Sequence, residues 1–329
     1  MNLYIDIENV ESLIDSRHHH LYDDCIKAMK KQFNIYFNFS KAELIKNEKL
    51  LAWFKLFSEG VSPKNKQEFA SVIFPERPLK SNTYITFDFK KLSSIYLLND
   101  ERIELLKSKG AILIGAPGQE MEIFSFLFFH QGDYLFEKKL RINGPDFAKW
   151  DDLQIYSCNL TDIIIVDSYI LSESDLIESN LLAFLKTISI KSRCKVNIVL
   201  YTHHDQVSLP YSELSKMVRS SIESITGISP NFTLIQYRDQ KGQDVVAAEH
   251  DRTIITNYMR IYSGDSFKYF TRSGRKITKG REIHFSSLAN TENFELAAEL
   301  LSDLENKISA LPGEFIEGDK KSNFIQFQK

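Results

Sequence analysis

The sequence predicts an α/β protein built from two domains. Its 329 residues exceed the usual size of a single domain. The second half alternates apolar, β-branched segments with amphipathic ones, which indicates an α/β domain with a mainly parallel sheet. The first half mixes helix and strand patterns without that order, so we expect an α+β domain there. The polar, turn-rich stretch 144–152 lies between them, and we therefore place the domains at 1–150 and 151–311, followed by a polar tail at 312–329.

The composition is that of a globular protein with a sizeable core, because 43% of the residues are hydrophobic and 26% are charged. The net charge of -3 gives no overall attraction to nucleic acid, so any surface that binds nucleic acid must be local. The cysteines, Cys25, Cys158 and Cys194, are widely spaced and lack the paired spacing of a metal site. We therefore expect reduced thiols, and neither a metal nor another cofactor.

The first residues lack a basic region followed by an apolar stretch, so a signal peptide is not expected. The most apolar segments, such as 121–129, are too short to span a bilayer. We expect a cytoplasmic protein without membrane insertion.

Local patterns assign the elements of the first half. Residues 2–10 alternate apolar and acidic side chains, which predicts a half-buried strand. We expect a solvated loop at the histidines of 18–20, a plain turn at 115–118 and core packing of the aromatic segment 120–134. The further expected elements are helices at 21–31, 41–57 and 91–109 and strands at 33–39, 83–89 and 111–115.

The opening strand allows a sharper interpretation. Asp6 lies near its end and Asn9 follows, and this YIDIENV sequence resembles the metal-binding start of PIN and NYN ribonucleases. That fold needs further acidic residues at strand ends to hold Mg²⁺, and Asp88 is one candidate. Because no ordered series of strand–helix units is evident afterwards, we expect an ordinary edge strand instead.

The second half has a more regular pattern. We expect strands at 162–170, 194–201 and 231–237 and helices at 176–188, 212–226 and 290–311. In such sheets functional side chains lie at the carboxyl ends of strands. The candidates there are Asp167, His203, His204 and Asp205, which line one crevice or are ordinary polar groups of loops.

The densest group of phosphate-handling residues lies in the segment 249–270. It reads His250, one residue, Arg252, four residues, Asn257, six residues, Gly264 and then Asp265 and Ser266. This resembles the signature of the phospholipase D superfamily, which is His-x-Lys, four residues, Asp, six residues and Gly-Ser. The resemblance implies a phospholipase-D-like fold for 151–311. It also implies phosphate binding by His250, Arg252 and Ser266.

The departures from the signature favour binding over cleavage. In the family the histidine attacks phosphorus, the lysine neutralises the phosphoryl oxygens and the aspartate orients an imidazole. Arg252 can still bind a phosphate through its bidentate fork, whereas Asn257 cannot supply a carboxylate. The pattern is similar to the phospholipase-D-like C-terminal domain of eukaryotic MIT-domain proteins, which use the fold for binding.

An enzyme remains the alternative. Active members of the superfamily assemble two such motifs, and this chain contains one. An active form would therefore be a homodimeric, metal-independent nuclease or phosphodiesterase. His250 would then be the nucleophile, Arg252 the phosphate clamp and Asn257 the remaining signature residue, with the His250 of a second copy as acid.

A basic run follows the signature. It is either a solvated hairpin or a basic surface that binds along the backbone of a polyanion. In the second case Tyr258, Tyr262, Phe267 and Tyr269 are available for stacking. Its members are Lys268, Arg272, Arg275, Lys276, Lys279 and Arg281. Our leading hypothesis is a non-catalytic protein that binds phosphate and nucleic acid. We further hypothesise a protein partner in a bacterial multi-protein system, such as antiviral defence, although no residue motivates that context.

Overall fold

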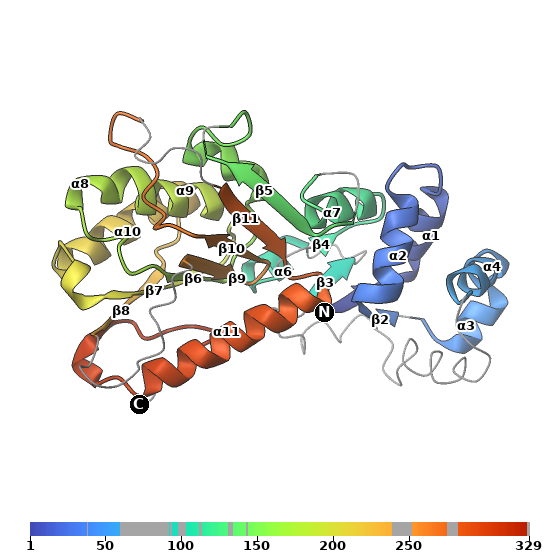
Figure 1. Ribbon diagram of the computed structural model, residues 1–329. Coiled ribbons are helices and arrows are strands. Elements are labelled where there is room, and N and C mark those ends of the chain that lie inside the picture. The colour runs from blue at the N-terminus through green and yellow to red at the C-terminus, as the bar shows by residue number, and fades with distance from the viewer. Residues whose placement is uncertain are drawn as a thin grey trace. The chain divides into compact units, whose positions relative to one another are not determined.

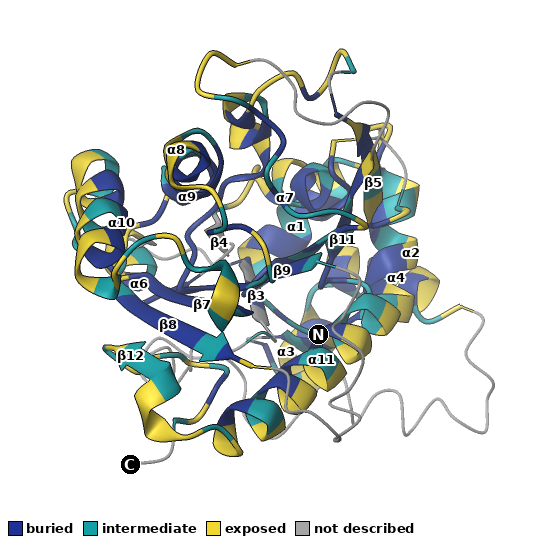
Figure 2. Ribbon diagram, turned by 60° about the vertical axis from the view of Figure 1, so that its left-hand side comes forward, coloured by how far each residue is buried: buried dark blue, intermediate teal, exposed yellow. Residues whose placement is uncertain are grey.

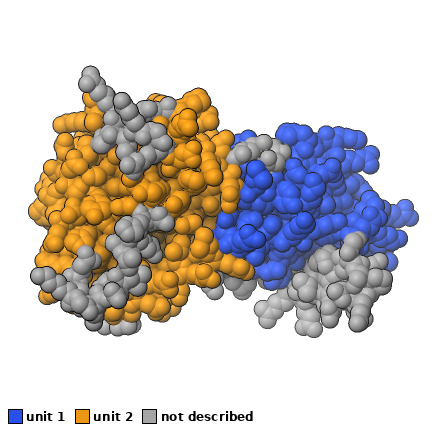
Figure 3. Space-filling view, in the orientation of Figure 1, with its two compact units in different colours: residues 1–136, 289–294 blue, residues 137–288, 295–329 orange. Residues whose placement is uncertain are grey.

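The computed structural model describes ten stretches of the chain, which fall into two compact units (Figure 3). One unit comprises residues 1–136 and 289–294, and the other comprises 137–288 and 295–329. The described stretches are 1–37, 39–59, 92, 94–97, 103–111, 114–130, 134–142, 144–238, 252–274 and 282–327. The expected strand at 83–89, with Asp88, lies outside them.

The first unit contains a four-stranded parallel sheet in the order β2-β1-β3-β4 (Figure 1). Its elements are β1 (Asn2–Ile5), α1 (Ile7–Asp15), α2 (Tyr22–Gln32), β2 (Asn34–Phe37), α3 (Lys41–Lys46), α4 (Glu48–Phe57), β3 (Ser94–Leu97), α6 (Ile103–Ser108), β4 (Ile114–Gly115) and α7 (Glu120–Leu127). Parallel strands joined by helices form an α/β unit, so the expected α+β class is wrong for the described residues. β1 lies between β2 and β3, so it is not the edge strand that we expected.

Capping residues explain one difference from the predicted helices. Asn47 accepts a hydrogen bond from Leu50 N at 3.1 Å, and Ser40 forms a capping box with Glu43. These caps start two helices, α3 and α4, where the apolar pattern predicted one.

The core of this unit agrees with the aromatic pattern of 120–134. Phe124, Phe126, Phe128 and Phe129 are buried, as predicted. The histidines at 18–20 lie in an exposed turn, also as predicted. The helix expected at 91–109 is wrong in part, because its first half contains β3, whose Ile95 and Leu97 are buried.

The second unit is organised by an eight-stranded sheet in the order β12-β8-β7-β6-β9-β10-β11-β5. Its strands are β5 (Glu137–Arg141), β6 (Asp162–Val166), β7 (Asn197–His203), β8 (Asn231–Tyr237), β9 (Arg252–Thr256), β10 (Met259–Ser263), β11 (Glu282–Ser287) and β12 (Ile316–Gly318). Its helical segments are η2 (Trp150–Tyr156), α8 (Ser174–Ile177), η3 (Glu178–Leu182), α9 (Ala183–Ser189), η4 (His204–Gln206), α10 (Tyr211–Thr226) and η5 (Gly313–Phe315), and α11 (Thr291–Ser309) begins in the first unit.

The sheet is mixed, so the predicted mainly parallel sheet is wrong, although the α/β class holds. β6, β7 and β8 are parallel, whereas β9, β10, β11, β5 and β12 pair antiparallel with their neighbours. The strand–helix alternation ends at β8. A tight turn at Asn257 and Tyr258 then joins β9 to β10, and such a connection produces an antiparallel pair.

Burial follows the position of each strand in the sheet. Ile163, Ile164 and Ile165 of β6 are fully buried, which explains why the strand reads as an uninterrupted apolar run. Figures 1 and 2 show α8, α9 and α10 on one side of the sheet and α11 on the other. Among the described residues, no helix is both long and apolar enough to cross a membrane.

The segment predicted to be a polar tail adds an edge strand. β12 pairs with β8, and Asp319 accepts a hydrogen bond from Phe232 N at 2.7 Å while pairing with Arg219. Asp162 of β6 accepts hydrogen bonds from Ser322 Oγ at 2.9 Å and from Asn323 N at 2.8 Å. The second unit begins at Glu137 and not at residue 151 as expected, because β5 pairs with β11.

Candidate phosphate-binding site

The candidate site lies in the second unit, at the carboxyl end of β6. Val166 is the last residue of β6 and pairs with Thr253 of the antiparallel strand β9. Arg252, the first residue of β9, therefore lies level with Asp167, which directly follows β6. Ligands of α/β sheets bind at this edge.

Asp167 holds the loop that contains the end of the signature. Asp167 is 1% exposed, and its carboxylate accepts hydrogen bonds from Ser266 Oγ at 2.9 Å, Phe267 N at 2.8 Å and Tyr169 N at 2.9 Å. Burial raises the pKa of Asp167, although these hydrogen bonds and the charge of Arg252 act in the opposite direction. The bonds from Ser266 and Phe267 fix the loop against the end of β6.

Arg252 is held against the same loop. Its Nη1 donates a hydrogen bond to Gly264 O at 3.1 Å, and its guanidinium carbon lies 5.5 Å from the centre of the Tyr169 ring. That distance is within the range of a cation–π interaction. Arg252, Gly264 and Ser266 are separated along the signature, and the fold brings them together around Asp167.

Asn180 is a second anchor of the loop, which the sequence interpretation missed. It lies in η3, a π-helical turn, and it is buried. Its Oδ1 accepts from Tyr269 N at 2.8 Å and from Phe270 N at 2.9 Å, and its Nδ2 donates to Phe270 O at 2.7 Å. The only signal in the sequence is an asparagine among apolar residues of a predicted helix.

Asn257 does not belong to this cluster, contrary to its place in the signature. It follows the last residue of β9, whereas Arg252 is the first, so about 16 Å of extended strand separates them. Asn257 is fully buried, and its Oδ1 accepts a hydrogen bond from Thr161 N at 3.1 Å at the amino end of β6. The missing carboxylate at Asn257 therefore gives no information about catalysis near Arg252. The argument for binding over cleavage that we based on Asn257 is wrong.

The basic run contributes little charge to the site within the described residues. Lys268 Nζ lies 2.7 Å from Glu173 Oε1 and donates to Ser172 Oγ at 2.6 Å, so its charge is neutralised locally. Arg272 is exposed. The remaining predicted residues of the site, His250, Arg275, Lys276, Lys279 and Arg281, lie outside the described stretches.

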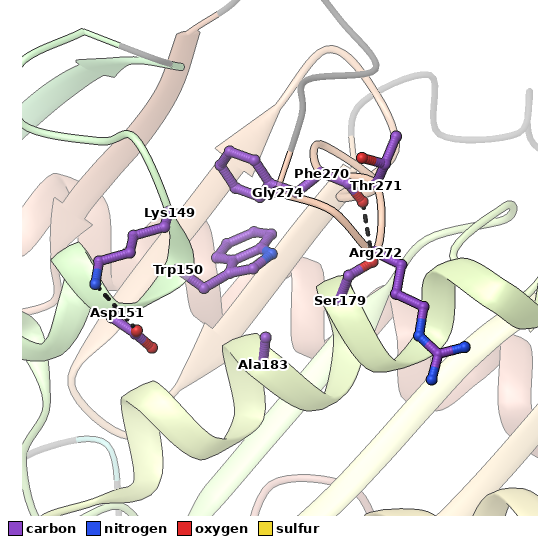
Figure 4. Close-up of a pocket in the computed structure, with 9 residues that line it drawn as sticks. All are labelled: Lys149, Trp150, Asp151, Ser179, Ala183, Phe270, Thr271, Arg272 and Gly274. Atoms are coloured by element: carbon purple, nitrogen blue, oxygen red, sulfur yellow. Dashed lines mark hydrogen bonds and ion pairs between the residues drawn. The ribbon is translucent and has the colours of Figure 1, made fainter.

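Arg272 lines a shallow pocket that does not provide a stacking surface. Figure 4 shows its guanidinium extending away from Trp150 and Phe270, which are each 3% exposed. The pocket is lined by Lys149, Trp150, Asp151, Ser179, Ala183, Phe270, Thr271, Arg272 and Gly274. Lys149 also pairs with Asp151 at 3.4 Å. A nucleobase could not reach the buried rings without displacing their neighbours.

The aromatic residues expected to stack on bases are mostly core residues. Tyr258 and Phe267 are 1% exposed and Tyr269 is fully buried, so the stacking role is wrong for them. Tyr262 is half-buried, with its ring edge-on to His284 at 5.4 Å. The sequence could not show that these side chains face the interior.

His203, the last residue of β7, and His204, which follows it, lie at the same edge of the sheet as the site. His204 Nδ1 is 2.7 Å from Gln236 Oε1, and Gln236 Nε2 donates to Glu317 Oε2 at 3.0 Å. His203 packs edge-on against Tyr237 with ring centres 5.1 Å apart, and its Nδ1 accepts from Asp205 N at 3.3 Å.

The first unit has its own polar cluster at the carboxyl edge of its parallel sheet. Asp6 directly follows β1 and is buried, and its N–H donates to Leu97 O at 2.9 Å. Asn9 is fully buried, and neither atom of its amide has a hydrogen-bond partner within the described chain. Glu120 accepts from Ser12 Oγ at 3.0 Å, and burial raises the pKa of its carboxyl.

This cluster does not by itself complete a metal site. Within the described residues, no group of three His, Cys, Asp or Glu side chains is close enough to hold a metal ion. No model of a known protein family matches the chain, and no curated protein matches it. The function must therefore be argued from the geometry of the sites.

Proposed function

We propose that this chain binds the phosphodiester backbone of a nucleic acid at Arg252, as a phospholipase-D-like module that does not cleave its ligand. The proposal is supported by the convergence of Arg252, Gly264 and Ser266 around Asp167 at the carboxyl end of β6. Arginine at such an edge binds phosphate through charge and paired hydrogen bonds.

The rigidity of the loop also supports binding. Asp167 holds the loop at Ser266 and Phe267, and Asn180 holds it at Tyr269 and Phe270. A loop that is already ordered loses little conformational entropy when a ligand binds. The overall charge of -3 opposes a polyanion, so we expect modest affinity that falls steeply with salt. The hypothesis of a protein partner in a bacterial multi-protein system, such as antiviral defence, stays open alongside this proposal.

The test is fluorescence anisotropy of labelled single- and double-stranded DNA and RNA in EDTA, with wild type and Arg252→Ala. Losing one arginine–phosphate contact should weaken binding about tenfold on every sequence and reduce the salt slope by about one. Arg193→Ala is the matched control, because Arg193 is exposed and lies before the amino end of β7. Equal affinity of wild type and Arg252→Ala would refute the proposal.

The same samples test the homodimeric nuclease. Cleavage in EDTA that His250→Ala abolishes, by a protein that sediments as a dimer, supports the enzyme in place of the binding module. Intact oligonucleotides after prolonged incubation support binding alone.

A second candidate function is specifically favoured by the first unit. β2 lies on one side of β1, and β3 and β4 follow on the other side. The strand order therefore reverses at β1, and Asp6 directly follows that strand. α/β sheets bind ligands at such a point. The ordered parallel sheet, whose apparent absence weighed against a PIN or NYN ribonuclease, is present in the described residues.

We propose, as this second function, hydrolysis of nucleic acid that depends on a divalent metal bound near Asp6. The buried amide of Asn9, which has no hydrogen-bond partner among the described residues, fits such a site, because Mg²⁺ binds carboxylate and amide oxygens. Asp6 and Asn9 would hold the ion, which when bound supplies a polarised water. Glu120 fits less well, because Ser12 and Gly118 N already donate to its carboxylate.

The test is twofold. Calorimetric titration with Mn²⁺ should show binding to wild type that Asp6→Asn weakens, and cleavage of labelled RNA and DNA should require Mg²⁺ or Mn²⁺. Asp15→Asn is the control, because the Asp15 side chain is 71% exposed and lies at the opposite end of α1. Unchanged Mn²⁺ affinity in Asp6→Asn contradicts this second function.

A further inference from the structure

A chain of hydrogen bonds fixes the proton position of His204. Gln236 Nε2 donates to Glu317 Oε2 at 3.0 Å, while Gln236 Oε1 lies 2.7 Å from His204 Nδ1. An ionised carboxylate only accepts hydrogen bonds, so the amide nitrogen faces Glu317 and the amide oxygen faces His204. That oxygen also only accepts, so His204 Nδ1 must carry a hydrogen. In the neutral ring, Nε2 is then the acceptor.

His204 and Arg252 lie on the same face and at the same edge of the sheet. Residues paired in register share a face, and so do residues two apart along a strand. The register connects Ile254 to Ile165, Ile165 to Leu200 and Thr202 to Gln236. Arg252 is two residues from Ile254, and His204 bonds to Gln236, so both belong to this face. β9 and β7 are separated by β6 alone, which places their backbones about 10 Å apart.

The imidazole of His204 is held by contacts with two other residues. The ring of Phe315 is edge-on to the His204 ring at 5.9 Å and 87°, which adds to the constraint from Gln236. His204 is half-buried, and within the described chain its Nε2 makes no hydrogen bond. This combination presents a fixed acceptor at the edge of the sheet that carries the proposed phosphate contact.

The acceptor distinguishes between types of nucleic acid. Backbone phosphates accept hydrogen bonds and cannot donate to Nε2, whereas a ribose 2′-hydroxyl can donate. DNA lacks this hydroxyl, and base donors vary with sequence. We propose that His204 accepts a hydrogen bond from a 2′-hydroxyl of the strand bound through Arg252, so that the site prefers RNA. The inference rests on the proposed function of the Arg252 site.

The experiment compares single-stranded RNA, DNA and 2′-fluoro RNA of one mixed sequence by anisotropy in EDTA. The 2′-fluoro strand keeps an RNA-like sugar but lacks the donor. His204→Asn is the informative variant, because its amide can replace Nδ1 toward Gln236 while Nε2 is removed. His18→Asn, at an exposed turn residue, is the control.

Wild type and His18→Asn should bind RNA about three- to tenfold more tightly than the other two strands, the value of one hydrogen bond. His204→Asn should remove this preference and leave DNA affinity unchanged. A wild type without RNA preference, or a preference that survives His204→Asn, overturns the inference. Arg252→Ala distinguishes the two proposals, because it should weaken the binding of all three strands. If it weakens the binding of none, the proposed function of the Arg252 site is refuted, whatever the result for His204.

NMR without a ligand tests the tautomer of His204 independently of the binding assays. Long-range ¹H–¹⁵N spectra of the full chain should show His204 with the proton on Nδ1 at neutral pH, assigned by its absence in His204→Asn. Gln236→Leu should release this tautomer and lower the RNA preference. A proton on Nε2 in the wild type would falsify the inference directly.

Discussion

Replacing Asp167 by asparagine removes a titratable group from the loop anchor and preserves its shape. Asp167 Oδ2 accepts from Ser266 Oγ and Phe267 N, and Oδ1 accepts from Tyr169 N. In Asp167→Asn, one of these positions becomes an NH₂ group that faces a donor. At least one buried N–H is then unsatisfied, and we expect a loss of about 1–3 kcal/mol in the free energy of unfolding.

The pH dependence of this loss has a definite sign. Burial raises the pKa of Asp167 in the folded state above its unfolded value. The stability that this group contributes is therefore full below the unfolded pKa, about 3.9, and is lost as the pH rises through the folded pKa. Asparagine does not titrate. The destabilisation by Asp167→Asn should therefore be largest near pH 4 and should shrink as the pH rises.

The assay is urea denaturation followed by the fluorescence of Trp150, at several pH values between 4 and 8. Trp150 is buried in the second unit, and Trp53 belongs to the first. A Trp53→Phe background therefore makes the signal specific for the second unit, whose unfolding is analysed separately. Asp175→Asn, an exposed residue of α8, is the matched control. A destabilisation that grows as the pH rises refutes this account of Asp167.

Two further predictions concern anchors of the same unit. Asn180→Leu removes the hydrogen-bond partners of Tyr269 N, Phe270 N and Phe270 O. It should lower the free energy of unfolding, measured by urea denaturation, by about 2–4 kcal/mol, and it should weaken oligonucleotide binding measured by anisotropy. Unchanged binding would show that the loop does not contribute to the binding site. Gly318→Ala should destabilise by more than about 1 kcal/mol, because Gly318 has a φ of +112° and a Cβ would lie 2.2 Å from Phe232 O. Gly313→Ala, with open space around it, is its control, and equal effects on the melting temperature would contradict this explanation.

Local patterns predicted the elements of the second unit well and their directions poorly. The segment 231–237 is β8 as expected, and the helix predicted at 212–226 is α10 with one further residue. Periodicity reports which residues are buried, but it does not report which strands become neighbours. β9 inserts beside β6, and only the tight turn after it indicates an antiparallel pair.

The site shows the same limit at the level of single residues. The spacing of the signature predicted that Arg252 and Ser266 act together, and both are held near Asp167. It also suggested that Asn257 belongs with them, which is wrong because Asn257 follows the last residue of the strand that Arg252 begins. Asn180 contacts a loop 90 residues away, and no local pattern encodes such a bond.

The two proposed activities make different chemical demands, which allows them to be tested independently in the intact chain. Binding at Arg252 depends on a permanent positive charge and needs no metal, whereas hydrolysis near Asp6 depends on a divalent ion. EDTA therefore isolates the second unit without any truncation. In EDTA, Asp6→Asn should bind oligonucleotides like wild type while Arg252→Ala binds weakly. With Mg²⁺, Asp6→Asn should lose cleavage, and Arg252→Ala should lower it only at subsaturating substrate. If Asp6→Asn weakens binding in EDTA, the nucleic acid contacts the first unit without metal, and the assignment of binding to Arg252 alone is wrong.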